Sequence, residues 1–288
     1  MLERVARPLA GLWNGIAAVS SGFYRLLGGP GKLLQDFLNG SWLGHSLHPV
    51  LTDVVIGGAT VAVFLDILRV FFSVDGLETA TAWTLGLTAV SGLGAIVTGL
   101  TDFKDTATGD ERNIAGLHGL INIVAVLIFA VSLLQRAGGG HDGALWTLLL
   151  GYLVISVGSY IGGHVVFKYG YMVNHNAFAR GKKAADFTAV MPADGLADAT
   201  PMRASLGATN LVVVRRGDVV FALKETCSHA GGPLSEGTVR GDTIVCPWHG
   251  STFRLSDGAV RDGPASSRQV AYRARISAGQ VEVQGPIE

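Results

Sequence analysis

The chain has 288 residues, enough for two ordinary domains, and it is 49% hydrophobic but only 15% charged. Soluble proteins usually have about a quarter of their residues charged, so the composition argues against a wholly soluble protein. The formal net charge is zero, and nothing in the charge balance indicates a nucleic-acid partner. The mean hydropathy of +0.40 averages over two unlike parts of the chain.

Residues 1–49 form an amphipathic N-terminal segment. Its apolar stripe contains Trp13, Ile16, Val19, Phe23, Leu26 and Leu27. The basic residues outside this stripe are Arg4, Arg7, Arg25 and Lys32. Such a helix lies in the membrane interface or packs against a helical bundle, and the sequence leaves both interpretations open.

Four long apolar stretches occupy residues 50–167. They cover residues 50–72, 80–100, 114–135 and 144–167. Each is close to the roughly 20 residues that a helix needs to cross a bilayer. The last three contain no Asp, Glu, Lys or Arg, and consecutive helices without a polar face favour a four-helix transmembrane domain. Close helix contact is expected at the glycines of the second stretch, which are Gly86, Gly92, Gly94 and Gly99.

The basic residues around the spans predict the orientation in the membrane. One face collects Arg4, Arg7, Arg25, Lys32, Lys104, Arg112, Lys168, Arg180, Lys182 and Lys183, and the other has only Arg69 and Arg136. Because basic residues accumulate on the cytoplasmic side, both termini are predicted to be cytoplasmic, in a multi-pass protein of the bacterial inner (plasma) membrane. Within the first span, Asp66 is expected to pair with Arg69, about one helical turn away.

A weak internal repeat links the two halves of this membrane domain. Leu47-His48-Pro49 opens the first span, and Leu117-His118-Gly119 opens the third. Gly99 with Phe103-Lys104 ends the second span, and Gly163 with Phe167-Lys168 ends the fourth. The pattern indicates two helical hairpins related by an axis along the membrane normal.

The character of the chain changes after the last span. Residues 168–187 are predicted to be a basic linker, and residues 188–288 a small all-β domain. Short β-rich runs at 211–214, 219–223, 243–245 and 281–283 are separated by Gly, Asp and Pro. This spacing is typical of a compact all-β domain.

Each of the two cysteines precedes a histidine, in Cys227-Ser228-His229 and Cys246-Pro247-Trp248-His249. The spacing places one Cys and one His on each of two loops. Two thiolates bind one iron and two imidazoles bind the other in one type of [2Fe–2S] cluster, so these four residues are the predicted metal ligands. A Cys₂His₂ zinc site is the alternative, but zinc knuckles use two closely spaced cysteines, which this chain lacks.

With these residues in place, the segment 227–264 resembles Rieske domains of the ferredoxin type, and the resemblance covers residues 188–288. Gly231-Gly232-Pro233-Leu234 follows the first pair, Gly250 follows the second, and Gly263-Pro264-Ala265 resembles the loop that covers the cluster. The resemblance implies that Cys227 and Cys246 hold the inner iron and that His229 and His249 hold the outer one. It also places Ser251 and Pro264 in the cluster environment.

Departures from related classes refine this expectation. High-potential Rieske proteins of cytochrome bc complexes carry an extra Cys in each loop, which this chain lacks. Ser251 matches a serine that hydrogen-bonds the cluster in that class, whereas Phe253 stands where that class has a tyrosine. Because hydrogen bonds to the sulfurs raise the potential, a low-to-intermediate potential is predicted. The lack of a disulfide fits a reducing cytoplasm.

Five further histidines are expected near the cytoplasmic face, namely His45, His48, His118, His164 and His175. Of these, His48, His118 and His164 are candidates for a b-type haem or metal site across the bundle. A quinone pocket is the second interpretation, in which a histidine and Asp53 or Asp102 exchange protons. The third is that these side chains only hydrogen-bond helix ends.

The region with His45-x-x-His48-Pro49, Asp53 and His118-x-x-x-Asn122 resembles an uncharacterised bacterial membrane family with four helices, across residues 40–170. That resemblance implies a fold but no activity. No histidine follows His249, so the mononuclear iron site of Rieske oxygenases is not expected.

Three functions therefore stay open. The first is a membrane-anchored Rieske protein that relays single electrons between a soluble or membrane redox partner protein and the membrane. The second is a quinone- or haem-dependent membrane oxidoreductase with its site at the cytoplasmic end of the bundle. The third is a redox-sensing or assembly module. Whether the protein is itself an enzyme is left undecided.

Overall fold

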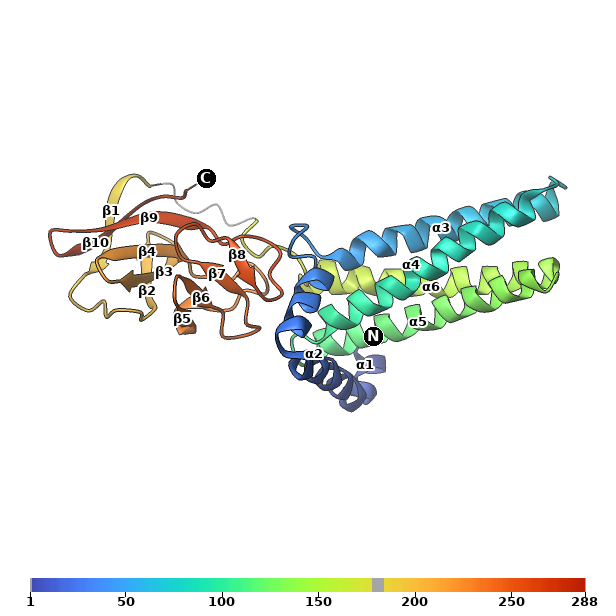
Figure 1. Cartoon of the computed structure of the whole chain (residues 1–288), viewed down its shortest axis with the longest axis horizontal. Coiled ribbons are helices and arrows are strands. Elements are labelled where there is room, and N and C mark those ends of the chain that lie inside the picture. Colours follow the sequence, from blue (N-terminus) through green and yellow to red (C-terminus); the bar gives the residue numbers. More distant parts are fainter. Residues whose placement is uncertain (1, 178–183, 288) are drawn as a thin grey trace. The chain divides into compact units, whose positions relative to one another are not determined.

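The structure is a computed structural model that describes residues 2–177 and 184–287. Its internal contacts divide the chain into two units. The first comprises the chain through Asn39 together with Ser46–Tyr171, and the second comprises Gly40–His45 together with Met172 and the residues after it. The first unit is helical and the second is built of strands (Figure 1). This confirms the predicted order of a membrane helix bundle followed by an all-β domain.

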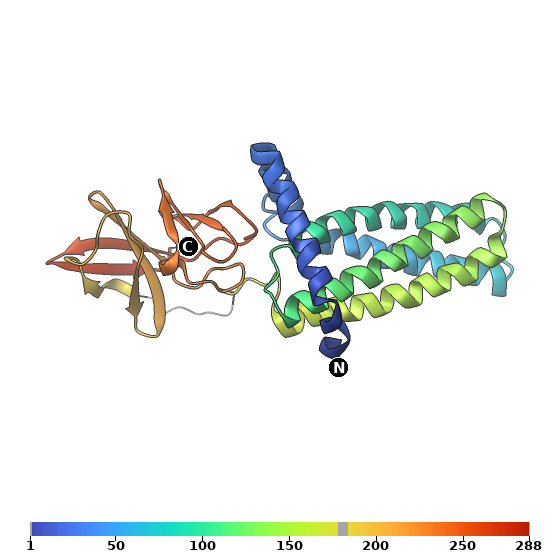
Figure 2. The ribbon, with the colours of Figure 1, turned by 90° about the horizontal axis from the view of Figure 1, so that it is seen from below.

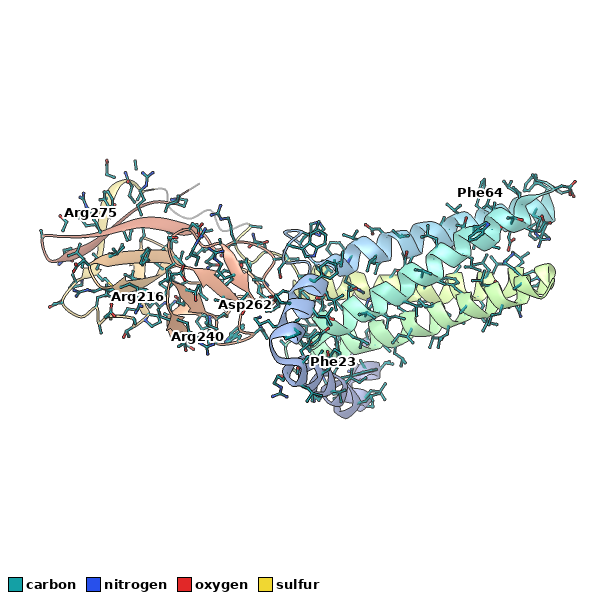
Figure 3. The ribbon with its side chains drawn as sticks, viewed as in Figure 1. Phe23, Phe64, Arg216, Arg240, Asp262 and Arg275 are labelled. Atoms are coloured by element: carbon teal, nitrogen blue, oxygen red, sulfur yellow. The ribbon has the colours of Figure 1, made fainter. Side chains whose placement is uncertain are left out.

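Four long helices form the body of the first unit. They are α3 (Leu47–Phe71), α4 (Leu77–Phe103), α5 (Asp110–Ala137) and α6 (His141–Tyr169). Among the described helices, these four are long and apolar enough to cross a membrane. At most 39% of the most apolar window of any span is buried within the chain, so most of the apolar surface needs lipid to cover it. Phe64, for example, extends outward from α3 (Figure 3) and is 57% exposed.

Glycines allow the helices to approach closely, as predicted for three of the four in α4. A Cβ added at Gly92 would lie 2.7 Å from Val126 Cγ2 on α5, and one at Gly99 would lie 2.8 Å from His48 Cε1 on α3. Gly94 packs against Leu51, whereas Gly86 faces open space. Small residues at these positions therefore set the interhelical distance.

The two hairpins α3–α4 and α5–α6 carry equivalent contacts. In the first hairpin, the Nδ1 atom of His48 lies 2.9 Å from the carbonyl oxygen of Ala95. In the second, the Nδ1 atom of His118 lies 2.8 Å from the carbonyl oxygen of Gly158. A Cβ at Gly162 would lie 2.7 Å from His118 Cε1, matching the contact between Gly99 and His48. The internal repeat seen in the sequence thus corresponds to two similar histidine–glycine contacts, but the glycine equivalent to Gly99 is Gly162 and not the predicted Gly163.

The N-terminal segment consists of α1 (Leu2–Ala6), the 3₁₀ turn η1 (Arg7–Leu9) and α2 (Ala10–Asn39), which bends at Gly28. Figure 2 shows α2 running across one end of the bundle. Trp13 packs against Gly116 of α5, and the Tyr24 hydroxyl lies 2.6 Å from Thr101 Oγ1 of α4. The opposite face exposes Val19, Phe23, Leu26 and Leu33. The segment therefore packs on the bundle and keeps a second apolar face.

A buried ion pair connects α3 and α5 towards the other end of the bundle. Arg136 donates from Nη1 and Nη2 to the two oxygens of Asp66, at 3.0 and 2.5 Å. The expected partner Arg69 is also near, with Nε 3.6 Å from Asp66 Oδ1. The sequence therefore predicted the weaker contact of Asp66 and missed the bidentate one, whose partner is 70 residues away.

Replacing Arg136 by Leu should destabilise the bundle by about 3–5 kcal/mol, because it leaves the Asp66 carboxylate buried without its bidentate partner. The double variant Asp66→Leu/Arg136→Leu should recover much of this loss. Thermal unfolding of the detergent-purified protein measures both. A single variant as stable as the wild type would show that the pair does not hold α3 to α5.

The second unit contains two sheets. A six-stranded antiparallel sheet has the order β1-β10-β9-β4-β3-β2. Its strands are β1 (Ala184–Pro192), β2 (Met202–Leu206), β3 (Thr209–Arg216), β4 (Val219–Lys224), β9 (Ala271–Ser277) and β10 (Gln280–Gly285). A smaller sheet has the order β5-β6-β7-β8, formed by Thr238–Arg240, Thr243–Val245, Thr252–Arg254 and Val260–Asp262. The short 3₁₀ turn η2 (Leu234–Glu236) precedes β5.

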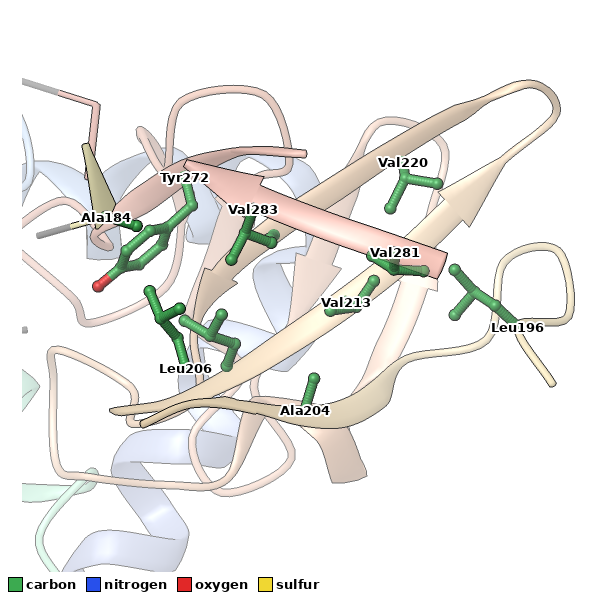
Figure 4. Close-up of a cluster of buried hydrophobic side chains, with 11 residues drawn as sticks. Ala184, Leu196, Ala204, Leu206, Val213, Val220, Tyr272, Val281 and Val283 are labelled. Atoms are coloured by element: carbon green, nitrogen blue, oxygen red, sulfur yellow. The ribbon is translucent and has the colours of Figure 1, made fainter. Parts of the chain in front are cut away.

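Two apolar cores stabilise this unit. One, drawn in Figure 4, packs Leu206, Val213, Tyr272 and Val281 with their neighbours in the larger sheet. The other lies between the sheets and includes Phe253, which is fully buried. Charged side chains such as Arg216, Arg240 and Arg275 lie on the outside of the unit (Figure 3), whereas the exterior of the bundle is apolar.

The segment 168–187, expected as a linker, has three described parts. Helix α6 continues to Tyr169, residues 172–177 belong to the second unit, and β1 begins at Ala184. The basic residues Arg180, Lys182 and Lys183 lie outside the described residues.

Candidate iron–sulfur site

The first cysteine loop leaves the end of β4. Glu225 is buried there, and its carboxylate accepts hydrogen bonds from the backbone N–H and the hydroxyl of Ser235. Beyond it, the Cys227 N–H donates to Gly232 O at 2.9 Å, and the Gly231 N–H donates back to Cys227 O at 3.0 Å. Gly231 has a φ of +80°, a conformation that glycine adopts without strain. These bonds close a tight ring around Cys227.

The second cysteine loop joins β6 to β7 and repeats this pattern. The Cys246 N–H donates to Ser251 O at 2.8 Å, and the Gly250 N–H donates to Cys246 O at 3.1 Å. Gly250 has a φ of +75°. Each cysteine is therefore followed, four residues on, by a glycine in the left-handed region. The glycine four residues after each cysteine, Gly231 and Gly250, is visible in the sequence. The turn at each cysteine requires it, because the residue there has a positive φ.

The two loops bring the sulfurs together in an environment shielded from solvent. Cys227 is 1% exposed and Cys246 is 3% exposed, and both belong to the core between the sheets. A Cβ at Gly232 would lie 2.9 Å from Cys246 Sγ, so the backbone approaches this sulfur closely. The Cys227 thiol and the N–H groups of Trp248 and His249 lower the pKa of Cys246 to about 7. The neighbouring Cys246 sulfur and burial raise the pKa of Cys227.

The two histidines of these loops also meet each other. The ring centroids of His229 and His249 are 5.1 Å apart, with the rings nearly perpendicular at 84°. His229 is 6% exposed, His249 is half-buried, and the adjacent Trp248 is 57% exposed. The structure thus brings the two cysteines together and the two histidines together, with the more accessible side on the second loop. Among the described residues, no three of the four predicted ligands already form a metal-binding group.

A third loop, between β8 and β9, closes on the second. A Cβ at Gly263 would lie 2.7 Å from Ser251 Cα, and Pro264 is buried. Ser251 is fully buried, and its hydroxyl oxygen accepts a hydrogen bond from the Ala265 N–H at 3.1 Å. Because this contact uses an acceptor site of the hydroxyl, its own proton stays available for another acceptor. Both predicted environment residues therefore lie at the cysteine loops.

The chemistry of these donors fits an iron–sulfur cluster. Thiolates suit iron–sulfur and zinc sites, and imidazoles suit both metals. The N–H groups of His229 and Ala230 point at the Cys227 sulfur, as those of Trp248 and His249 do at Cys246. Such hydrogen bonds stabilise cluster sulfurs. In the described residues neither cysteine is in a disulfide, so both thiols stay available to the metal.

Of the candidate histidines in the membrane domain, only two are seen in contact with each other. The ring centroids of His48 and His118 are 6.2 Å apart with the rings nearly perpendicular, so these two side chains meet between α3 and α5. His164 lies instead beside the Tyr160 ring, at 6.3 Å. Asp102 is buried and accepts a hydrogen bond from the Ser46 hydroxyl at 2.9 Å. Two of the three candidates, His48 and His118, therefore form a pair, and the printed ring contact of His164 is with Tyr160.

Fold and site together define an iron–sulfur protein of the Rieske class with a helical membrane domain. Comparisons with known proteins agree: residues 186–275 match the model of the Rieske [2Fe-2S] domain. Residues 44–175 match the model of a family described as predicted membrane proteins, DUF2231.

Several of the related proteins are ferredoxins. The ferredoxin CarAc of Metapseudomonas resinovorans is 38% identical over 80 residues, which cover 28% of this chain and 75% of CarAc. The ferredoxin subunit of anthranilate 1,2-dioxygenase from Burkholderia cepacia is 34% identical over 90 residues, 31% of this chain and 83% of that subunit. A solved complex of oxygenase and ferredoxin in carbazole 1,9a-dioxygenase contains a chain that is 32% identical to this one, with a TM-score of 0.34. The match covers 36% of this chain and 99% of the chain in the complex. The chain belongs to the Rieske ferredoxin family through its C-terminal domain, and this family implies a [2Fe–2S] cluster.

Sequence reasoning missed two polar residues near the site. Gln269 is 1% exposed and bonds to the first cysteine loop, and Asn176 is 6% exposed and bonds to Gln269. Neither residue belongs to a recognisable motif. Only the short polar run Asn174-His175-Asn176 after the last span offered a signal.

Replacing His249 by Cys should lower the midpoint potential strongly. Histidine-ligated clusters lie at roughly −150 to +300 mV, whereas all-cysteine plant-type clusters lie near roughly −400 mV. Redox titration of the detergent-purified protein, followed by EPR, measures the change. An unaltered potential and spectrum would show that His249 is not a ligand.

Replacing Ser251 by Ala should lower the midpoint potential while the cluster content is kept, because a hydrogen bond to the cluster is lost. Ser205→Ala, on the exposed surface of the same domain, is the matched control and should leave the potential unchanged. Equal potentials for both variants would mean that the Ser251 hydroxyl donates elsewhere.

Proposed function

We propose that this protein relays single electrons between a redox partner protein and the membrane. The paired cysteine–histidine loops are the main support for this proposal, since their two thiols and two imidazoles are the donor set of a Rieske cluster. A bound cluster of this kind supplies reversible one-electron chemistry. The domain that holds it is attached to a predicted membrane domain with four candidate spans.

Some residues around the site shield the sulfurs from water, and others leave the second loop accessible to a partner protein. The core that includes Cys227 and Cys246 excludes water from the sulfurs. On the second loop, His249 is half-buried and Trp248 is exposed beside it. Exposed tryptophans contribute strongly to protein interfaces, so a partner docking on Trp248 would approach the site from the His249 side.

The names of the relatives indicate the chemistry of this partner. Two of them are ferredoxins, one named as a subunit of a dioxygenase. The proposed partner is accordingly a soluble reductase or an oxygenase-type acceptor. The excess of basic residues supports a cytoplasmic position for the Rieske domain and both termini, in the inner membrane of a bacterial cell.

A second candidate function is the exchange of electrons with a membrane quinone at the end of the bundle. The pair of His48 and His118 favours it. Each Nδ1 atom lies within hydrogen-bond distance of a backbone carbonyl, which can only accept, so each neutral ring donates from Nδ1 and has its lone pair on Nε2. In His118 the Asn122 amide nitrogen lies 3.4 Å from Nε2, so the Nε2 atom of His48 is the better acceptor. A quinol hydroxyl is a suitable donor to such a nitrogen. A b-type haem on the same pair would be a related form of this function.

Replacing Trp248 by Ala should slow reoxidation of the reduced cluster by an oxygenase-type acceptor about tenfold or more, because truncating a hot-spot side chain costs about 2 kcal/mol or more. The midpoint potential should stay unchanged. Val219→Ala, at an exposed apolar residue on β4, is the control. Stopped-flow measurement of the second-order rate tests this, and equal rates for all three proteins would remove Trp248 from the docking surface.

The quinone candidate is tested in proteoliposomes that contain ubiquinol or menaquinol. If the bundle exchanges electrons with quinol, the cluster is reduced in the wild type and much more slowly in His48→Leu and His118→Leu. The optical spectrum of the dithionite-reduced protein tests for haem. Reduction that is equally fast in the wild type and both variants would rule out the histidine pair as the site.

A further inference from the structure

A short segment after the last span takes part in the first cysteine loop. This strap, residues 172–176, begins three residues beyond the end of α6 at Tyr169. The His175 N–H donates to Ser228 O at 3.0 Å. Asn176 Nδ2 donates to Thr226 O and to Gln269 Oε1, both at 3.0 Å. The strap is therefore bonded to the residues on both sides of Cys227.

Gln269 completes this arrangement from the approach to β9. Its Oε1 atom also accepts from the Ser228 N–H at 3.1 Å, and its Nε2 atom donates to Lys224 O and Thr226 O at 2.5 and 2.6 Å. Because Asn176 and Gln269 are almost fully buried, these amide bonds are shielded from competition with water. The two amides together hold the backbone of residues 224–228.

The orientation of the Asn176 amide follows from its partners. Both are acceptors, so the nitrogen must face them, and the opposite assignment would place an oxygen against two oxygens. The preceding residues of the strap lie near His229. Met172, Val173 and Asn174 line a small recess together with Ser228, His229, Ser266 and Ser267. Met172 has a φ of +63°, which is uncommon for a residue other than glycine and often accompanies functional sites.

We propose that the strap is a wall of the cluster site and that Asn176 is a positioning residue for the first ligand loop. The strap lies outside the Rieske match at residues 186–275, so the family does not assign it this role. The proposal rests on the presence of a cluster and does not depend on the route of the electrons.

The strap would affect the cluster through the backbone N–H groups of the first cysteine loop. The N–H groups of His229 and Ala230 point at the Cys227 sulfur, and they belong to the same loop that the strap and Gln269 hold. Hydrogen bonds to cluster sulfurs raise the potential. Loosening residues 226–228 should lengthen these bonds and lower the midpoint potential.

The test uses the full-length, detergent-purified protein with its cluster. Asn176→Leu removes the two donated bonds at similar volume, and Asn176→Asp turns them into contacts between oxygens. Both variants should show a lower midpoint potential and altered EPR g values, with the larger change in Asn176→Asp. Asn210→Leu, at an exposed asparagine of the same domain, should match the wild type in both measurements.

Two outcomes would overturn the proposal. One is an unchanged potential and spectrum in both variants. The other is a loss of cluster content or thermal stability while the clusters that remain keep the wild-type potential and g values, which would mean a merely structural role. Should neither variant assemble a cluster, hydrogen exchange in the wild type decides: the His175 amide, which donates to Ser228 O, is expected to exchange slowly, and rapid exchange would contradict the strap. Electron transfer to any partner is not part of these measurements, so they stand apart from the proposed function.

Discussion

The hydrogen-bonded ring around each cysteine is the feature on which the iron–sulfur site depends. In both loops the cysteine N–H donates to the carbonyl five residues on, and a glycine four residues on donates back. The ring turns further N–H groups towards the sulfur, where they stabilise the thiolate form. Because Cys227 and Cys246 also belong to the core between the sheets, the interactions that fold this domain are the ones that shield the sulfurs from water.

The membrane unit meets a different physical requirement. Most of its apolar surface faces outward, so lipid replaces the core that a soluble domain would need. Its polar groups are paired inside the bundle, as in the ion pair between Asp66 and Arg136 and the contacts of His48 and His118 with backbone carbonyls. Unpaired polar groups are costly in hydrocarbon, which explains why these side chains occur in pairs.

The sequence predicted the spans, the all-β domain and the match to a Rieske domain because each depends on a local pattern. Span length, strand spacing and the cysteine–histidine motifs are all readable within about 20 residues. Contacts between distant residues were not predictable in this way. Arg136 lies 70 residues from Asp66, and Asn176 lies 93 residues from Gln269. No local period marks these partners, and burial alone makes their bonds important. The contact of His48 with His118 likewise depends on helix packing that the spacing does not encode.

The strap does more than connect the Rieske domain to the membrane domain. A passive linker would leave the cysteine loops unaffected, whereas residues 172–176 bond directly to the first loop. A soluble fragment that began at β1 would keep both sheets, both cysteines and Gln269, yet it would lose the donors that Asn176 supplies to Thr226 and Gln269. Thr226 O and Gln269 Oε1 would each keep one donor, Gln269 Nε2 and the Ser228 N–H respectively. The carbonyl of the buried Ser228 would lose the His175 N–H and would have to bond to water or remain unpaired, at a cost of about 1–3 kcal/mol. For this reason the segment that follows the last membrane helix is better regarded as part of the iron–sulfur domain than as a spacer.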